Sequence, residues 1–240
     1  MVEATPGKPA IEINRLIKSF NHRPVLRGID LKVNRGESVV IFGPNGAGKT
    51  TLLKILATVM KPTSGDITIE GFDLKKDADE VRRRIGVVSH QSFLYGSLTA
   101  YENLEFYARL QDIQNPGRRA KEVAAMVNMT ARLGDRISTF SRGMQQRISI
   151  ARALLHKPSV LLMDEPETGL DQHAIAMLWS LLSQGGHTIL LTTHSLERGL
   201  ELADRVIILN KGKIVLEKPG REIDLKGCKQ AYLELTGDRP

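Results

Sequence analysis

The sequence predicts an α/β fold with a mostly parallel sheet, an antiparallel β portion near the N-terminus and an inserted helical lobe. Residues 11–20 and 25–33 alternate apolar and polar side chains, as half-buried strands do. Later apolar runs are short and continuous, which is typical of buried strands, and helical patterns separate them. From about residue 92 to 155 the pattern is helical throughout. The short runs are residues 38–42, 66–70, 85–89, 160–163, 188–193 and 206–210.

Local signals predict where several elements begin and turn. Thr99 and Glu102 have the spacing of a helix capping box. Pro116 suits the first turn of a second helix that extends to about residue 129. The other expected elements are helices at 51–60, 143–156 and 221–236 and a hairpin turn at Lys211-Gly212.

The chain of 240 residues suits one globular domain with an inserted lobe. Apolar residues make up 41% and charged residues 25%, which are ordinary values for a soluble protein. We expect a single domain over 1–240, with a flexible tail at 1–10, a core at 10–91 and 156–220, a helical lobe at 92–155 and a C-terminal tail at 221–240.

Composition excludes several classes of function. The net charge is +7, but no run of Lys and Arg is interleaved with aromatic residues, so we expect no nucleic-acid partner. The lone cysteine, Cys228, cannot form an internal disulfide. No stretch approaches the roughly 18 apolar residues of a membrane span, and the N-terminus lacks the apolar core of a secretory signal. We therefore expect that any transport path is supplied by another chain.

A glycine-rich segment after the strand at 38–42 matches the phosphate-binding pattern G-x-x-x-x-G-K-[ST]. Glycines let backbone N–H groups crowd the phosphates, and the helix that starts near Gly48 directs its positive end at the anion. Lys49 is expected to reach the β and γ phosphates, and the Thr50 hydroxyl is expected to bind Mg²⁺. The expected ATP-binding residues here are Gly43, Pro44, Asn45, Gly46, Ala47, Gly48, Lys49, Thr50 and Thr51.

Two carboxylates follow the apolar strand at 160–163. A carboxylate at the end of a strand beside the phosphate loop suits the Mg²⁺ shell, and we expect Asp164 to have that role. The next carboxylate, Glu165, points elsewhere and is expected to orient or deprotonate the attacking water.

At this point the chain resembles the ATPases of ABC transporters, which are P-loop NTPases with a RecA-like core. Phe140-Ser141-Arg142-Gly143-Met144 resembles the ABC signature, and it lies just upstream of the Asp164 strand as in the family. Gln91 looks like the Q-loop glutamine, a catalytic and Mg²⁺-binding residue. Asp171 looks like the D-loop aspartate, and His194 looks like the switch histidine that contacts the γ-phosphate. Phe20 looks like the aromatic residue that stacks on adenine, although by itself it would also suit an ordinary strand.

The signature departs from the common Leu-Ser-Gly-Gly-Gln at two positions, Arg142 and Met144, while Ser141 and Gly143 are kept. The resemblance implies that these four residues complete the ATP site of a second subunit, in a homodimer closed head to tail over ATP and Mg²⁺. It also implies transmembrane permease subunits as partners and a location on the cytoplasmic face of the cell membrane.

Among transporters, the chain most resembles the haem-exporter ATPases of cytochrome c maturation. The residues that carry this likeness are His90-Gln91, 94–99, 102–104, 106–110 and 140–144. Exporters of drugs, lipids or polysaccharides share parts of the pattern and remain alternatives, as does an ATP-gated mechanical module that moves no cargo. A two-cassette repair or ribosome ATPase is disfavoured by the single phosphate loop, and a kinase is disfavoured by the signature and His194.

Overall fold

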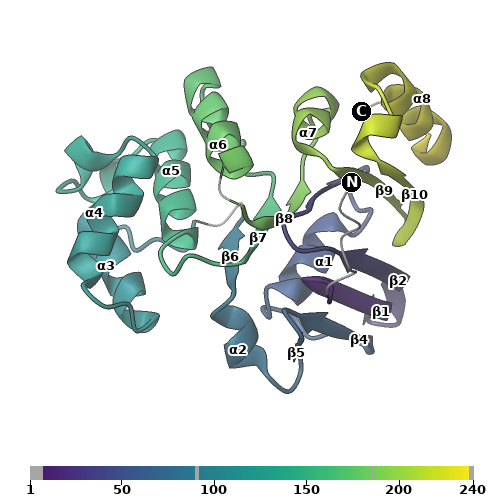
Figure 1. Cartoon of the computed structure of the whole chain (residues 1–240), viewed down its shortest axis with the longest axis horizontal. Coiled ribbons are helices and arrows are strands. Elements are labelled where there is room, and N and C mark those ends of the chain that lie inside the picture. Colours follow the sequence, from purple (N-terminus) through teal and green to yellow (C-terminus); the bar gives the residue numbers. More distant parts are fainter. Residues whose placement is uncertain (1–7, 90–91, 185, 238–240) are drawn as a thin grey trace, which may run out of the picture.

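The structure is a computed structural model that describes residues 8–89, 92–184 and 186–237. It contains two β-sheets on one side and a separate helical lobe on the other (Figure 1). This is the predicted α/β fold, with a mostly parallel sheet, an antiparallel β subdomain and an inserted helical lobe.

The antiparallel sheet is built from the N-terminal part of the chain. Its strand order is β2-β1-β4-β5, and each neighbouring pair is antiparallel. Alternating side chains of its two long strands are buried, because only one face of the sheet packs on the core. The strands are β1 (Ile11–Phe20), β2 (Arg23–Val33), β4 (Ser64–Ile69) and β5 (Phe72–Asp73).

The larger sheet has the order β10-β9-β3-β8-β7-β6, and all its pairs are parallel except that of β9 with β10. Every residue of β3, β7 and β8 is buried, which explains their continuous apolar sequences: both faces of this sheet are covered. The strands are β3 (Ser38–Phe42), β6 (Ile85–Val88), β7 (Val160–Asp164), β8 (Thr188–Thr192), β9 (Arg205–Asn210) and β10 (Lys213–Pro219).

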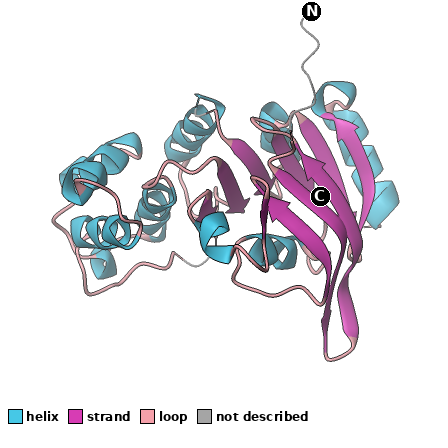
Figure 2. Cartoon of the chain, turned by 60° about the horizontal axis from the view of Figure 1, so that its bottom comes forward, coloured by secondary structure: helices cyan, strands magenta, loops and turns pink. Residues whose placement is uncertain are grey.

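Helices cover the sheets and form the lobe (Figure 2). The core helices are α1 (Lys49–Leu56), α2 (Ala78–Arg82), α6 (Gln172–Gln184), α7 (Leu196–Leu202) and α8 (Leu225–Thr236). The lobe contains α3 (Ala100–Leu110), α4 (Pro116–Met126) and α5 (Arg142–Ala153). Short 3₁₀ turns occupy Thr130–Arg132, Ile137–Thr139 and Gly220–Glu222.

The apolar core has two parts, one on each face of the larger sheet. Alternate strand residues such as Val40 and Met163 face the lobe, α6 and α8. Their neighbours, such as Ile41 and Leu162, face α1 and the antiparallel sheet. Because the lobe shares the first cluster with the sheet, α5 packs against the sheet at β6, the neighbour of the strand that ends at Asp164.

Most expected elements are confirmed, with corrections at their ends. The capping box at Thr99 and Glu102 is formed, and Lys211 and Gly212 both have positive φ in the hairpin turn. The helix expected at 51–60 ends at Leu56, and the tail helix begins at residue 225 because Asp224 caps it. The strand expected at 66–70 ends at Ile69, since Glu70 turns to a positive φ. Helix α2 and strand β5 were not expected, because both are too short to show a period.

Candidate nucleotide-binding and hydrolysis site

The phosphate loop lies between β3 and α1, at the carboxyl edge of the parallel sheet. Ligands bind at this edge in open α/β sheets because the connections after the strands leave a crevice there. Gly43 lies so close to the neighbouring strand that an added Cβ would be 2.2 Å from the Leu209 carbonyl oxygen. Gly46 and Gly48 have φ of 79° and 110°, which side chains other than glycine rarely tolerate. The backbone path of the loop therefore depends on its glycines.

The first turn of α1 is free to receive an anion. Gly48 precedes the helix without a side-chain cap, and the first turn contains no acidic residue. Unpaired backbone N–H groups and the positive end of the helix dipole therefore point out of the loop.

Lys49 is the buried cation of this loop, with only 6% of its surface exposed. Its ammonium group donates hydrogen bonds to the carbonyl oxygens of Gly43 and Pro44. Burial lowers the pKa of Lys49, and the nearby carboxylates Glu165 and Asp164 oppose that shift. The ammonium group is thus folded back over the loop, in the position where phosphate oxygens would replace the carbonyl groups.

Asp164 is the last residue of β7 and is 3% exposed. One of its carboxylate oxygens, Oδ1, accepts a hydrogen bond of 2.6 Å from the Thr192 hydroxyl at the end of the neighbouring strand. Asp164 and Thr50 both line a recess of about 340 Å³ beside α1. The structure therefore brings two of the three predicted Mg²⁺ ligands to one recess.

Glu165 and His194 meet across the carboxyl ends of β7 and β8. The His194 Nε2 atom contacts Glu165 Oε1 within ion-pair distance, and Glu165 turns out of the strand with a φ of 50°. The Glu165 side chain is 17% exposed and the His194 side chain is 50% exposed, so the pair borders solvent. This arrangement places the carboxylate and the imidazole in direct contact at the border of the phosphate-loop cavity, where both can act on a water molecule beside them.

The phosphate loop, Glu165 and His194 border one cavity of about 530 Å³. A volume of this size can hold a small ligand. Phe20 lies outside this lining at the end of β1; it is 43% exposed, and the Lys18 ammonium lies 4.8 Å from its ring centroid. The lining consists of Val25, Pro44, Asn45, Gly46, Ala47, Gly48, Lys49, Thr50, Thr51, Glu165 and His194.

The signature residues lie outside this lining, at the start of α5, and Arg142 borders a different cavity, of about 240 Å³, together with Glu165. Ser141 caps this helix, and its hydroxyl accepts a hydrogen bond from the Met144 N–H. Gly143 packs on the loop after Glu165: an added Cβ would lie 2.6 Å from the Gly169 carbonyl oxygen. No signature residue is in the lining of the phosphate-loop cavity in the described part of the chain. Ser141 and Arg142 are exposed, and Gly143 and Met144 are half-buried.

Both carboxylate oxygens of Asp171 have partners within the same chain. One of its carboxylate oxygens accepts from the Ala174 N–H at the start of α6, and the other pairs with Arg147 at 3.1 Å. The Ala174 hydrogen bond is the largest cause of a lowered pKa for Asp171, with the Arg147 charge adding to it. The chain therefore links the D-loop directly to the signature helix. Gln91 and its neighbour His90 lie outside the described residues.

Several residues of the site were not singled out in the sequence. Thr192 ends β8 and Thr193 directly follows it; their hydroxyl groups donate hydrogen bonds to the carboxyl groups of Asp164 and Glu167, respectively. Gln146 donates to the Pro166 carbonyl oxygen from α5. The only signal available was their position beside motif residues, because hydroxyl and amide side chains are common at strand and helix ends.

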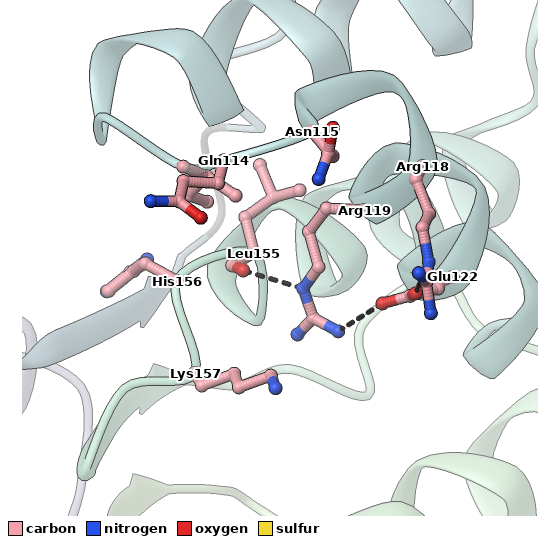
Figure 3. Close-up of a pocket in the computed structure, with 9 residues that line it drawn as sticks. Gln114, Asn115, Arg118, Arg119, Glu122, Leu155, His156 and Lys157 are labelled. Atoms are coloured by element: carbon pink, nitrogen blue, oxygen red, sulfur yellow. Dashed lines mark hydrogen bonds and ion pairs between the residues drawn. The ribbon is translucent and has the colours of Figure 1, made fainter.

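A further cavity, of about 340 Å³, lies between the start of α4 and the segment that follows α5 (Figure 3). Several basic side chains line this cavity. One of them, the buried Arg119, is already paired within the chain: it donates to the Leu154 and Leu155 carbonyl oxygens and forms an ion pair with Glu122. We interpret this arginine as the residue that fastens α4 to the end of α5.

Comparison with known proteins bears directly on the site. Residues 26–168, more than half of the chain, match the sequence family described as ABC transporter. The chain belongs to the ABC transporter family. The matched region includes the phosphate loop, the signature and the two carboxylates at the end of β7.

Curated relatives in the ABC family are similar in sequence to this chain over most of its length. The linearmycin resistance ATP-binding protein LnrL of Bacillus subtilis (strain 168) is 35% identical over 210 residues, covering 85% of this chain and 68% of LnrL. The daunorubicin resistance ATP-binding protein DrrA3 of Streptomyces coeruleorubidus is 35% identical over 219 residues, covering 89% and 69%. The Nod factor export ATP-binding protein I of Rhizobium meliloti (strain 1021) is 38% identical over 250 residues, covering 99% and 73%.

Solved structures show the same ABC fold. The ATP-binding cassette MJ0796, in a dimeric post-hydrolysis state bound to ADP and Pi, matches with a TM-score of 0.79 and 30% identity. That match covers 88% of this chain and 99% of the cassette. An ATP-binding subunit of an ABC transporter matches with a TM-score of 0.83 and 29% identity, covering 96% and 95%.

The chain is therefore an ATP-binding and ATP-hydrolysing subunit of the ABC type, a class that works as a dimer of cassettes with membrane permease subunits. Among the residues that the structure describes, no helix is both long enough and apolar enough to cross a membrane.

Proposed function

We propose that this ATPase powers a membrane exporter, and that two copies close head to tail over two ATP molecules. The observation that carries the proposal is the separation of two half-sites in one chain. Lys49, Glu165 and His194 face one cavity, while the helix start at Ser141 and Gly143 lies outside it.

In this proposal the phosphate loop binds ATP through backbone N–H groups and Lys49. Lys49 exchanges its two carbonyl acceptors for β- and γ-phosphate oxygens, which are stronger partners because they are charged. Phe20 is positioned at the end of β1 to stack on the adenine ring, as its exposed face allows.

The residues beside α1 fit a magnesium ion. Mg²⁺ prefers hard oxygen ligands and is usually held by one or two protein groups together with phosphate oxygens. The recess supplies the Thr50 hydroxyl and the Asp164 carboxylate, and no cluster of three or more metal-binding side chains exists within the described ranges. When bound, Mg²⁺ neutralises phosphate charge. We propose Thr50 and Asp164 as its ligands, with Gln91 as a third.

We propose that hydrolysis is carried out by Glu165 and His194. Glu165 orients and deprotonates the attacking water. His194 contacts Glu165, and the imidazole of His194 also donates a hydrogen bond to the γ-phosphate. The water oxygen forms a bond to the γ-phosphorus while the bond from that phosphorus to the β–γ bridging oxygen breaks, and ADP leaves with that oxygen. The proton released from the water passes to the Glu165 carboxylate. Lys49 stabilises the negative charge that remains on the phosphate oxygens.

The second half-site is proposed to act on the partner subunit's ATP. The start of α5 has backbone N–H groups, the Ser141 hydroxyl and a glycine that permits close approach, and these features together suit a γ-phosphate. Arg142 and Met144 occupy the two variant positions of this surface, and Asp171 borders it through Arg147. Loss of the γ-phosphate would remove the bridge and let the dimer open.

An exposed apolar surface is proposed as the docking site for the permease. Val59 and Phe93 are 66% and 46% exposed, and both line the recess that contains Thr50. Tyr95 and Phe106 extend the surface onto the lobe with their ring centroids 5.4 Å apart. Large exposed apolar patches mark interaction sites. We therefore place the ATPase on the cytoplasmic face of the membrane, against transmembrane subunits.

For the cargo, we propose export of a drug, a lipid or a polysaccharide. The names of the relatives, linearmycin and daunorubicin resistance and Nod factor export, support this alternative. They do not support haem export, which the sequence resemblance had favoured. Export of a drug from cells that produce this chain and its permease, compared with haem delivery to cytochrome c in the same cells, would separate the two cargos.

The dimer proposal is tested with Glu165→Gln, which should bind ATP without cleaving it. We expect this variant to elute as a dimer from a size-exclusion column in ATP and Mg²⁺ and as a monomer without nucleotide. Adding Ser141→Arg should abolish the dimer while each monomer still binds ATP. Adding Arg118→Ala, at an exposed position on the lobe, serves as the control and should leave the dimer intact. A Glu165→Gln protein that stays monomeric in ATP would refute the proposal.

A further inference from the structure

A half-buried glutamate, Glu167, lies close to the Glu165–His194 pair. Glu167 is two residues after Glu165, and its Oε1 atom accepts a hydrogen bond from the Thr193 hydroxyl. Thr193 directly precedes His194 and is 1% exposed. Glu167 belongs to none of the motifs described above, although it contacts the segment that presents the histidine.

We propose that Glu167 is a positioning residue for ATP hydrolysis: through Thr193 it holds the backbone on both sides of His194 in the conformation that pairs His194 with Glu165. The proposal rests on the hydrolytic roles proposed for Glu165 and His194.

The direction of the hydrogen bonds supports this role. A hydroxyl group has one proton, and the Thr193 proton points to the Glu167 carboxyl group, which is its acceptor. The lone pairs of the same oxygen then accept the Ser195 N–H at 3.0 Å. His194 lies between the two residues that this bond joins. The chain from Ser195 through Thr193 to Glu167 therefore restrains the backbone of the histidine from both sides.

The backbone after β7 separates the two glutamates. The Thr168 N–H donates to the Glu165 carbonyl oxygen, and the Leu170 N–H donates to that of Glu167. This turn leaves Glu165 at the phosphate-loop cavity and directs Glu167 inward, with buried Pro166 between them. One rigid turn thus sets the position of the catalytic carboxylate and, through Thr193, that of its histidine partner.

The surroundings of Glu167 raise the pKa of its carboxyl group. Burial is the main cause of the raised pKa of Glu167, and the charge of Glu165 adds to it, whereas the Thr193 hydrogen bond and His194 oppose it. The second oxygen, Oε2, is buried and has no hydrogen-bond partner among the residues described. A carboxyl group can accept the Thr193 proton in either protonation state, so the restraint does not depend on the charge of Glu167.

The test compares two variants at each end of the contact. Glu167→Gln keeps an acceptor oxygen, whereas Glu167→Met keeps the length of the side chain but removes the acceptor oxygen. Thr193→Ser keeps the hydroxyl, and Thr193→Val removes it at nearly constant shape. Steady-state ATP hydrolysis gives kcat and KM, ATP binding is measured separately, and thermal unfolding identifies any variant that fails to fold.

We expect Glu167→Gln and Thr193→Ser to retain kcat within about twofold, and Glu167→Met and Thr193→Val each to lower it about tenfold with KM and ATP affinity unchanged. The double variant Glu167→Met with Thr193→Val should be no slower than the slower single variant, because both break one chain. If Glu167→Met does not fold, the two Thr193 variants decide the question.

Full activity of Glu167→Met and of Thr193→Val would overturn the inference, as would equal losses in kcat and ATP affinity. Glu165→Gln in the same assay distinguishes a failure of the proposed hydrolytic site from a failure of the inference about Glu167. If Glu165→Gln remains active, the proposed hydrolytic site is wrong; if it is inactive while Glu167→Met is fully active, only the role of Glu167 is wrong.

Discussion

The hydrogen bond between Thr192 and Asp164 allows a quantitative test of how the site is held together. Thr192→Val replaces the hydroxyl by a methyl group of nearly the same size. The donor is fully buried, the carboxylate is 3% exposed, and the two oxygens are 2.6 Å apart. The substitution therefore leaves a buried carboxylate without its partner while the packing is nearly unchanged.

The expected cost follows from the charge of the acceptor. Hydrogen bonds to charged groups contribute about 1.5–3 kcal/mol, and removal of one partner from a buried charged group lies at the upper end, so we expect Thr192→Val to lower the free energy of unfolding by about 2–3 kcal/mol. At about 2–4 °C per kcal/mol for a domain of this size, the Tm should fall by about 4–12 °C.

Urea denaturation of the nucleotide-free protein measures the free energy, and calorimetry measures the Tm. Thr192→Ser is the matched control: it keeps the hydroxyl and loses a buried methyl group, which should cost about 1 kcal/mol. The reasoning is refuted if Thr192→Val is as stable as the unmodified chain, or more stable than Thr192→Ser. Either result would mean that the carboxylate is satisfied without Thr192.

Three further outcomes follow from the structure. Gly43→Ala should destabilise the protein by about 3 kcal/mol or more, because its Cβ would meet the Leu209 carbonyl oxygen at 2.2 Å, whereas Gly46→Ala, with open space around it, should cost only about 1–2 kcal/mol for its positive φ; urea denaturation of both variants measures the difference. Arg119→Met should lower the Tm by about 4–8 °C, since it removes two hydrogen bonds to the Leu154 and Leu155 carbonyl oxygens worth about 2 kcal/mol together, with no change in ATP affinity. The free energy of unfolding of Glu167→Gln should rise relative to the unmodified chain as pH increases: the folded-state pKa of Glu167 is raised, so its contribution to stability is full below pH 4.5 and is lost as pH rises through the raised value, whereas glutamine does not titrate; unfolding measured from pH 5 to 8 that shows a constant difference would contradict this.

Much of the fold was predictable because strong local patterns agreed with their tertiary environment. The glycine loop depends on backbone conformation and close approach, which only glycine permits, so its sequence is informative by itself. The buried strands beside it are continuous apolar runs because both faces are covered. Helix α2 could not be predicted because it is too short to show a period. The exact ends of α1 could not be predicted because they depend on single turns and caps.

The site was predictable only where a motif named its residues. Nothing near Glu167 in the sequence connects it with Thr193, which is 26 residues away, and the bond exists because β7 and β8 are neighbours in the sheet. The same neighbouring strands place Thr192 on Asp164. The link from Asp171 to Arg147 likewise depends on how the lobe packs beside the D-loop.

The sequence by itself determined the class of the protein and the chemistry of its phosphate loop, because those depend on residue types at fixed spacings along a short stretch of backbone. Only the tertiary structure decided which groups support the hydrolytic residues. Hydroxyl, carboxylate and guanidinium groups on separate elements acquire their partners when the strands align and the lobe packs, and no local pattern records that pairing.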